Sequence, residues 1–466
     1  MWGKLKKTFI GDRKFYAMVL AIAVPIMIQN GITNFVNLLD NIMVGQIGTE
    51  QMSGVAIVNQ LIMVYNLCIF GGLSGAGIFT AQFYGQGDEE GIRRTFRFKL
   101  WLALLLTGLA ALLFLFQGES LIRMYLGGSS DGGDLALALA SGREYMLVLM
   151  LEFPAFMLVQ VYASTLRECG ETVLPMEAGI AAVFVNLVFN YILIYGKFGF
   201  PALGVVGAAA ATVLSRYVEA VIVVGRVHLR KENYPYMKGV YRTLKIPARL
   251  VRDITLKGTP LLLNETLWSA GMAMLVQCYS VRGLNVVAAM NISNTIGNLF
   301  NVVCIALGNA VAIVVGQLLG AGRMEEARDT DNKLIAFSVM CCIGAAAVMA
   351  LIAPVFPGLY NTNGEARTLA MNMIFLQALF LPQNAFLNAS YFTLRSGGKT
   401  LITFFFDSVF VWCVSIPVAW VLSRFTDFNV LAIVVLVSVA DWIKCVIGFV
   451  LVKKGVWIHN IVLEKQ

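Results

Sequence analysis

The sequence predicts an all-α membrane protein with about twelve transmembrane helices in two parallel six-helix repeats. Three observations predict this fold class: the composition, the placement of the basic residues and an internal repeat. Of the 466 residues, 58% are hydrophobic and only 13% are charged. A soluble domain carries roughly 25% charged residues, and a soluble chain this apolar would expose large patches and aggregate. The composition therefore excludes an ordinary soluble protein.

Apolar stretches long enough to cross a bilayer follow one another along the whole chain. A spanning helix needs roughly 20 mostly apolar residues. The stretches that meet this length are 15–42, 53–82, 98–117, 135–164, 173–195, 203–225, 254–280, 286–318, 334–356, 368–394, 401–423 and 430–452. Several are longer than a bilayer requires, which allows the helix to tilt or kink.

Basic residues gather before the first span and after each even-numbered span. The largest cluster lies between spans six and seven, whereas the loops on the opposite side carry almost no Lys or Arg. Cytoplasmic loops of membrane proteins are enriched in these residues. We therefore expect an even number of spans, with both termini in the cytoplasm. The net charge of +8 then reflects membrane topology, and we expect no nucleic-acid partner.

The first half of the chain repeats in the second half. At a shift of 235 residues, Pro25 aligns with Pro260 and Gln82 with Gln317. A shift of 228 aligns a later block, Thr165-Leu166-Arg167 with Thr393-Leu394-Arg395. Because each repeat has an even number of spans, both repeats enter the membrane in the same direction. We expect an N-terminal lobe at 1–230, a basic cytoplasmic linker at 231–253 and a C-terminal lobe at 254–466.

Parallel repeats of this kind indicate a secondary transporter, whose site lies between the repeats. Gene duplication can also build a membrane bundle with another role. A membrane enzyme would need clustered catalytic groups or metal ligands, and no HExxH or comparable motif occurs. No phosphate-binding GxxxxGK[ST] loop occurs either, which favours transport driven by an ion gradient. The turns at Gly85-Gln86-Gly87 and Gly320-Ala321-Gly322 are interpreted as tight turns that use glycine for positive φ.

Five segments have the sequence, order and spacing of one known family. They are Asp40-Asn41-Ile42-Met43-Val44-Gly45, the stretch from Ala81 to Asp88, Leu166 to Thr172, Asn186 to Tyr191, and Gly204 to Thr212. Together they resemble the multidrug and toxic compound extrusion (MATE) family, over essentially the whole chain. No single motif is decisive, but their recurrence in both halves makes the resemblance specific.

The resemblance implies a V-shaped, two-lobed bundle in the plasma membrane of a prokaryote, acting as a monomer among membrane lipids. It implies an antiporter that exports cationic or amphipathic drugs and toxic organic compounds in exchange for protons or sodium, by alternating access. It implies no enzymatic activity and no cofactor beyond the coupling ion. The alternative is a flippase or exporter of a lipid-linked or metabolite substrate on the same superfamily fold. A flippase that handles pyrophosphate should line its cavity with Arg or Lys, whereas the candidate charges here are acidic.

Asp40 is the leading candidate for ion coupling. A charge within the hydrocarbon costs about 3 kcal/mol or more, so such residues are candidates for function. Asn37 lies one turn away on the same face. In the family that the chain resembles, positions matching Asn186, Asn190 and Thr212 surround this aspartate as a cation and proton site. Two simpler explanations stay open: Asp40 reaches water at the end of its span, and the amides and hydroxyl only join helices.

Glu265 is the second acidic candidate, one turn beyond Pro260. Sodium-coupled family members pair the matching glutamate with an aspartate, but Asn384 stands at that place here. Glu265, Asn384 and Asn294 are therefore interpreted, together with Asn37, as lining a cavity for a cation or substrate, and sodium is possible at Asp40 or Glu265. Some members also carry aspartate where Asn190 stands. A structural hydrogen-bond role for Glu265 stays open.

Other membrane charges are interpreted as structural. Residues three apart on one helix can pair, which suggests Asp441 with Lys444 and Arg216 with Glu219. Glu152 has no evident partner in the sequence.

Overall fold

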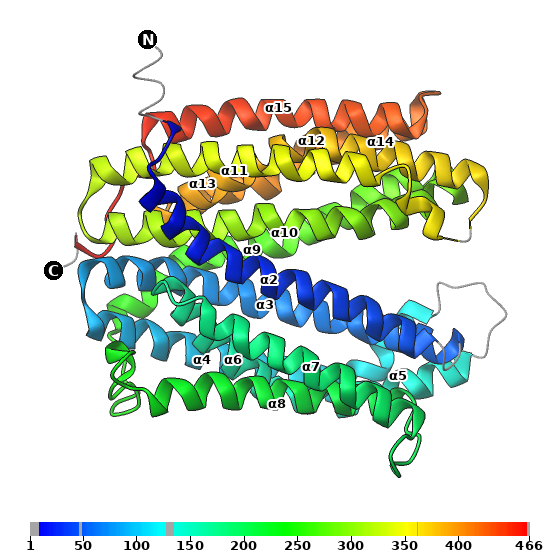
Figure 1. Cartoon of the computed structure of the whole chain (residues 1–466), viewed down its shortest axis with the longest axis horizontal. Coiled ribbons are helices and arrows are strands. Elements are labelled where there is room, and N and C mark those ends of the chain that lie inside the picture. Colours follow the sequence, from blue (N-terminus) through cyan, green and yellow to red (C-terminus); the bar gives the residue numbers. More distant parts are fainter. Residues whose placement is uncertain (1–8, 46–48, 127–134, 361, 464–466) are drawn as a thin grey trace. The chain divides into compact units, whose positions relative to one another are not determined.

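The computed structural model describes residues 9–45, 49–126, 135–360 and 362–463, and these ranges contain helices and no β-strand (Figure 1). The long helices are α2 (Arg13–Gly45), α3 (Thr49–Gln86), α4 (Glu89–Leu126), α5 (Leu135–Leu149), α6 (Phe153–Glu168), α7 (Val173–Tyr195), α8 (Val205–Leu229), α9 (Ala248–Ser280), α10 (Leu284–Gly320), α11 (Met324–Ile352), α12 (Gly364–Ser396) and α15 (Val430–Lys454). The shorter ones are α13 (Thr400–Phe404), α14 (Ile416–Phe425), the 3₁₀ turns η1 (Met150–Glu152), η2 (Pro235–Met237) and η3 (Phe356–Leu359), and the π-helical turns η4 (Phe405–Val409) and η5 (Val411–Ser415).

In the described part of the chain, 11 helical stretches are long and apolar enough to cross a membrane. The remaining predicted span, 254–280, lies in α9, which has 33 residues and is therefore about 50 Å long. Its polar side chains, among them Asn264 and Glu265, lower its hydropathy without interrupting the helix. The prediction of an all-α membrane bundle with about twelve spanning helices is confirmed.

The described residues form two compact units. The C-terminal unit contains Met1–Met27, Ala81–Asp88 and Ile254–Gln466. Within it α10 packs against α11 and α12, and α15 packs along α12 (Figure 1, green to red). Its main core joins residues of these helices to the first part of α2, through side chains such as Ile26, Leu307, Val311 and Leu394.

The N-terminal unit contains Ile28–Thr80 and Glu89–Asp253. Here α8 packs against α5, α6 and α7, and α4 packs against α5 and α6. The turn η1 separates α5 from α6, just before Pro154, which has no backbone N–H to continue the α-helical ladder. The division between the two units falls inside α2, two residues after Pro25.

Candidate functional site

Asp40 on α2 lies in the N-terminal unit, where α7 and α8 bring neutral polar groups toward it. The Nδ2 atom of Asn190 on α7 donates to Asp40 Oδ1 at 2.6 Å. The same atom lies 3.1 Å from Asn186 Oδ1, and Asn186 in turn contacts Thr212 Oγ1 on α8 at 3.2 Å. Asn186 and Asn190 are buried, whereas Asp40 is half-buried. The structure therefore brings four of the predicted residues into one hydrogen-bonded chain.

The side-chain amide of Asn186 can be placed in two ways. In one orientation its nitrogen donates to both carboxylate oxygens of Asp40 at 3.1 Å, and its oxygen accepts from Thr212 at 3.2 Å. In the other, the amide oxygen faces Asp40, which is favourable only if the carboxyl group carries a proton or a cation lies between them. In the first orientation Asn186 and Asn190 both donate to the carboxylate of Asp40.

Local sequence explains why these side chains meet. Asn186 and Asn190 are one turn apart on α7, so they share a face. Gly207 brings α8 close to α7, because a Cβ at this position would lie 2.6 Å from the backbone carbonyl of Leu193. Small residues of this kind permit close helix contact in membranes. The close approach puts Thr212, five residues further along α8, beside Asn186.

Glu265 lies in the C-terminal unit, within a second polar network. Tyr391 on α12 donates its hydroxyl to Glu265 Oε1 at 3.2 Å. Asn264 donates to the Tyr391 hydroxyl at 3.3 Å and to Asp407 Oδ2 at 3.2 Å. Its own Oδ1 accepts from Ser408 Oγ at 2.7 Å. The carboxylate of Glu265 is thus met by a phenol rather than by a second acid.

The other predicted cavity residues lie apart from this network. Asn384 on α12 is exposed, and none of the hydrogen bonds among the described residues joins it to Glu265. Asn294 on α10 is also exposed and accepts from Gln377 at 3.5 Å. The side chain of Asn37 falls outside the described part of the structure. Tyr391 and Asn264 were not predicted, and only a tertiary contact identifies them.

Several other charges at membrane depth are paired with charges of opposite sign. Lys444 donates to Asp407 Oδ1 at 2.5 Å, across helices, instead of pairing with Asp441 on its own helix. Asp441 accepts from Ser415 at 3.1 Å. The suggested pair of Arg216 with Glu219 is present at 2.9 Å, and Arg216 Nε also lies 3.8 Å from Glu152 Oε2. No ion pair between described residues includes Asp40 or Glu265.

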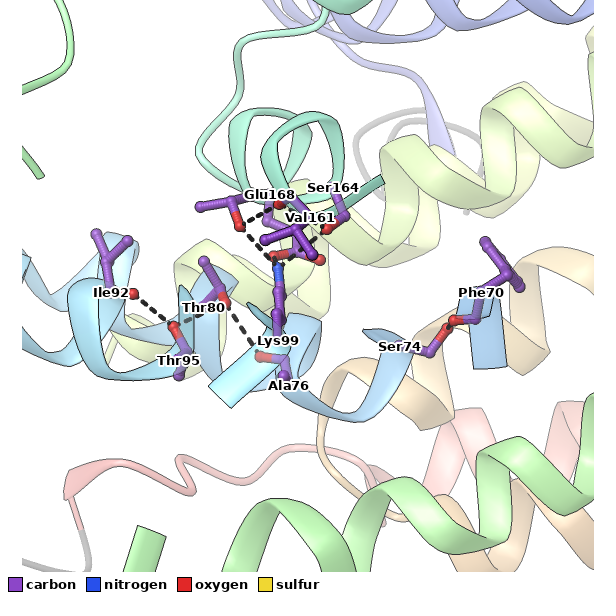
Figure 2. Close-up of polar contacts among 11 residues, drawn as sticks. Phe70, Ser74, Ala76, Thr80, Ile92, Thr95, Lys99, Val161, Ser164 and Glu168 are labelled. Carbon is purple, nitrogen blue, oxygen red and sulfur yellow. Dashed lines mark hydrogen bonds and ion pairs between the residues drawn. The ribbon is translucent and has the colours of Figure 1, made fainter. Parts of the chain in front are cut away.

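Lys99 is fully buried in the N-terminal unit, although it belongs to the basic residues that gather after the second predicted span. Figure 2 shows its side chain pointing from α4 to the end of α6, where it forms an ion pair with Glu168. Its Nζ also donates to Thr165 Oγ1 at 3.1 Å and to Ser164 Oγ at 3.3 Å. These contacts satisfy the ammonium group, so Lys99 joins two helices and presents no free charge.

Known proteins resemble this chain over most of its length. The sequence profile of the family described as MatE matches residues 25–192 and 260–421, together more than half of the chain. The "Probable multidrug resistance protein NorM" of Thermotoga maritima is 24% identical over 418 residues, which cover 89% of this chain and 87% of that protein. The multidrug resistance protein MdtK of Edwardsiella ictaluri is 27% identical, with 87% of each chain covered.

Solved structures have the same fold. An outward-facing multidrug resistance MATE family transporter of the MOP superfamily superposes with a TM-score of 0.84 at 21% identity, covering 97% of this chain and 98% of that one. A MOP superfamily transporter from Pyrococcus furiosus, described as having a binding pocket of reversed polarity, gives 0.82 at 20% identity, covering 95% and 96%. This chain belongs to the MatE family of membrane transporters.

Proposed function

We propose that this protein is a multidrug exporter that expels cationic or amphipathic compounds in exchange for protons or sodium. Curated relatives that match almost the whole chain are named multidrug resistance proteins, which supports the choice of cargo. The observation that carries the proposal is the environment of Asp40, an acidic group among neutral donors. A carboxylate that is not neutralised by Lys or Arg can bind a proton, a sodium ion or a cationic compound.

Exchange follows if the coupling ion and the cargo compete for Asp40. When the carboxylate is charged, the amides of Asn190 and Asn186 stabilise it and a cationic compound can bind. When it takes up a proton, Asn186 can turn its oxygen toward the carboxyl group and the attraction for a cation is lost. A site that binds either ligand and opens alternately to each side of the membrane is sufficient for antiport. Glu265 would receive the positive group of the cargo in the C-terminal unit.

The proposal also covers the location of the protein, its orientation in the membrane and its partners. We propose that both termini are cytoplasmic, which the distribution of the basic loops supports, and that the protein acts as a monomer among the lipids of a prokaryotic plasma membrane. A lipid-linked anionic cargo is the alternative function. Lys444 is a buried cation that would suit an anion only if it were free, but Asp407 neutralises it. This pairing favours cationic cargo.

The decisive experiment measures dye export by purified protein in proteoliposomes. We expect Asp40→Asn to abolish export of ethidium, while Asp427→Asn, the same change at an exposed loop position, leaves it intact. Export by Asp40→Asn at the wild-type rate would disprove the coupling role.

Imposed gradients identify the ion. Because Glu265 faces Tyr391 rather than a second acid, we expect a proton gradient to drive export at least as well as a sodium gradient. Strict sodium dependence without any response to a pH gradient would contradict this expectation.

A further inference from the structure

The N-terminal unit contains a cavity of about 410 Å³ between the start of α4 and the linker that follows α8. Arg93 and Arg97 line it from α4, and Lys238, Arg242 and Thr243 line it from the linker. Four of these five side chains are cationic. Neither the coupling site at Asp40 nor the Glu265 network shares a residue with this cavity.

The acidic groups around the cavity neutralise only part of this charge. Glu90 is the acidic lining residue, and it contacts Arg97 NH1 at 3.0 Å and Arg93 NH1 at 3.3 Å. Glu89 accepts from Arg93 NH2 at 2.7 Å. Lys238 and Arg242 are exposed, and no salt bridge between described residues includes either of them. Two cations in the cavity therefore have no protein counter-charge.

The arginines on α4 are held in place. Arg97 is buried, with 3% of its surface exposed, and its Nε donates to the backbone oxygen of Val240 at 2.8 Å. Arg93 NH2 donates to the backbone oxygen of Pro235 at 3.2 Å, whereas its buried Nε has no hydrogen-bond partner in the structure. A fixed guanidinium with an unused donor is suited to an anionic oxygen.

A turn in the linker brings its two cations to the same cavity. Gly239 has a φ of +72°, a conformation that favours glycine, and its carbonyl accepts from the backbone N–H of Arg242 at 3.0 Å. Lys238 and Arg242 lie on either side of this turn. The linker is therefore folded against α4 as a defined wall of the cavity.

Exposed apolar side chains lie next to the cavity-lining residues of α4 and of the linker. Trp101 is one turn beyond Arg97, and its indole N–H donates to the backbone oxygen of Leu244 at 3.4 Å. Trp101, Tyr241 and Leu244 are all close to half exposed, at 48%, 47% and 46%. Aromatic residues of this kind mark the head-group level of a bilayer. Beyond Trp101, as far as Phe116, the exposed side chains of α4 are leucines and the phenylalanine itself, as expected in the hydrocarbon region.

We propose that this cavity binds the phosphate group of an anionic phospholipid. Arginine and lysine side chains that converge at the cytoplasmic end of membrane helices are suited to lipid head groups. The exposed Trp101, Tyr241 and Leu244 favour a lipid over free phosphate, because they offer an apolar surface beside the cations. The bound head group would tie the linker to α4.

The test uses purified full-length protein in a neutral detergent and measures binding of dihexanoyl-phosphatidylglycerol by native mass spectrometry. The variant K238Q/R242Q removes the two uncompensated cations, which are exposed and leave the fold intact. The matched control is R230Q/K231Q, which makes the same charge change at exposed positions of the same linker outside the cavity. Each basic residue near a lipid surface contributes roughly a fivefold factor, so the double variant should bind about 25-fold more weakly.

The control should bind the lipid as the wild type does. Equal weakening in both double variants would overturn the proposal, because it would indicate general attraction to a basic linker. Dihexanoyl-phosphatidylcholine should bind more weakly than the anionic lipid, and equal binding would also overturn the proposal. Inorganic phosphate should not displace the lipid at equal concentration. Displacement would assign the cavity to free phosphate instead.

Discussion

The close contact of α3 with α10 at Gly85 and Gly320 provides the sharpest test of the packing. Both of these glycines belong to the C-terminal unit. A Cβ on Gly320 would lie 2.5 Å from the carbonyl carbon of Gln82, and a Cβ on Gly85 would lie 2.6 Å from that of Gln317. The two contacts are equivalent under the 235-residue repeat. Ordinary contact begins at 3.4 Å and the carbonyl oxygens lie closer still, so an alanine would force the two backbones apart by more than 0.9 Å (3.4 − 2.5).

The size of the stability loss depends on whether the atoms around the added Cβ can move away. Extra carbon in a packed core costs about 1–3 kcal/mol, and backbone on both sides cannot rotate away, so we expect about 3 kcal/mol for Gly320→Ala. Alanine in a helix interior gains about 0.5–1 kcal/mol over glycine, and Gly320, as the last residue of α10, gains at most this amount. The net loss of stability should therefore be about 2 kcal/mol. Gly344→Ala is the matched control, because no atom lies within 4 Å of its added Cβ, and it should gain about 0.5–1 kcal/mol.

Thermal unfolding in detergent can be followed with a thiol-reactive dye. Buried cysteines such as Cys304 and Cys342 react only when the protein opens, and exposed Cys413 sets the baseline. Gly320→Ala should unfold at a lower temperature than the wild type, and Gly344→Ala should not. The double variant Gly85→Ala/Gly320→Ala should lose less than the sum of the two singles, because one separation relieves both contacts. If Gly320→Ala and Gly344→Ala unfold at the same temperature, the close contact does not exist.

Three further changes test the polar contacts. Lys444→Met leaves the half-buried Asp407 without its cation and should destabilise the protein by about 3 kcal/mol in the same dye assay, whereas adding Asp407→Asn should restore most of the loss. Asn460→Ala removes two hydrogen bonds, of 2.8 and 3.0 Å, to carbonyls at the end of α10 and should cost about 1–2 kcal/mol, measured in the same way. Asn190→Ala removes a donor that favours the charged form of Asp40, so the pH at which dye export is half-maximal should rise.

The sequence predicted the membrane helices well because hydropathy is averaged over a whole span. It predicted their ends less well, since a helix can continue beyond the bilayer with polar residues. Thus α4 begins at Glu89 instead of residue 98, and α11 at Met324 instead of residue 334. The interpretation of the two glycine turns was also incomplete: Gly87 and Gly322 have positive φ, whereas Gly85 and Gly320 serve close helix contact.

The polar residues were likewise predicted only in part. Helical spacing predicted that Asn186 and Asn190 share a face, and the resemblance placed them beside Asp40. Spacing along one helix could not identify Asp407 as the partner of Lys444, because Asp407 lies in a π-helical turn of another element. Wide turns of this kind often occur at functional sites. Tyr391 was missed for the same reason, as it meets Glu265 only through the packing of α12 with α9.

The repeat preserves the places where helices are joined but not the charges that join them. Thr165 and Thr393 are equivalent positions, and each bonds a buried charged side chain, on α4 and on α11 respectively. Thr165 accepts from Lys99 at 3.1 Å, whereas Thr393 donates to Asp331 at 2.6 Å. A hydroxyl group can donate or accept, so the same threonine suits either sign of charge. Duplicated helices can therefore keep one packing geometry while their membrane charges diverge, which is what leaves Asp40 in one unit and Glu265 in the other without a counterpart.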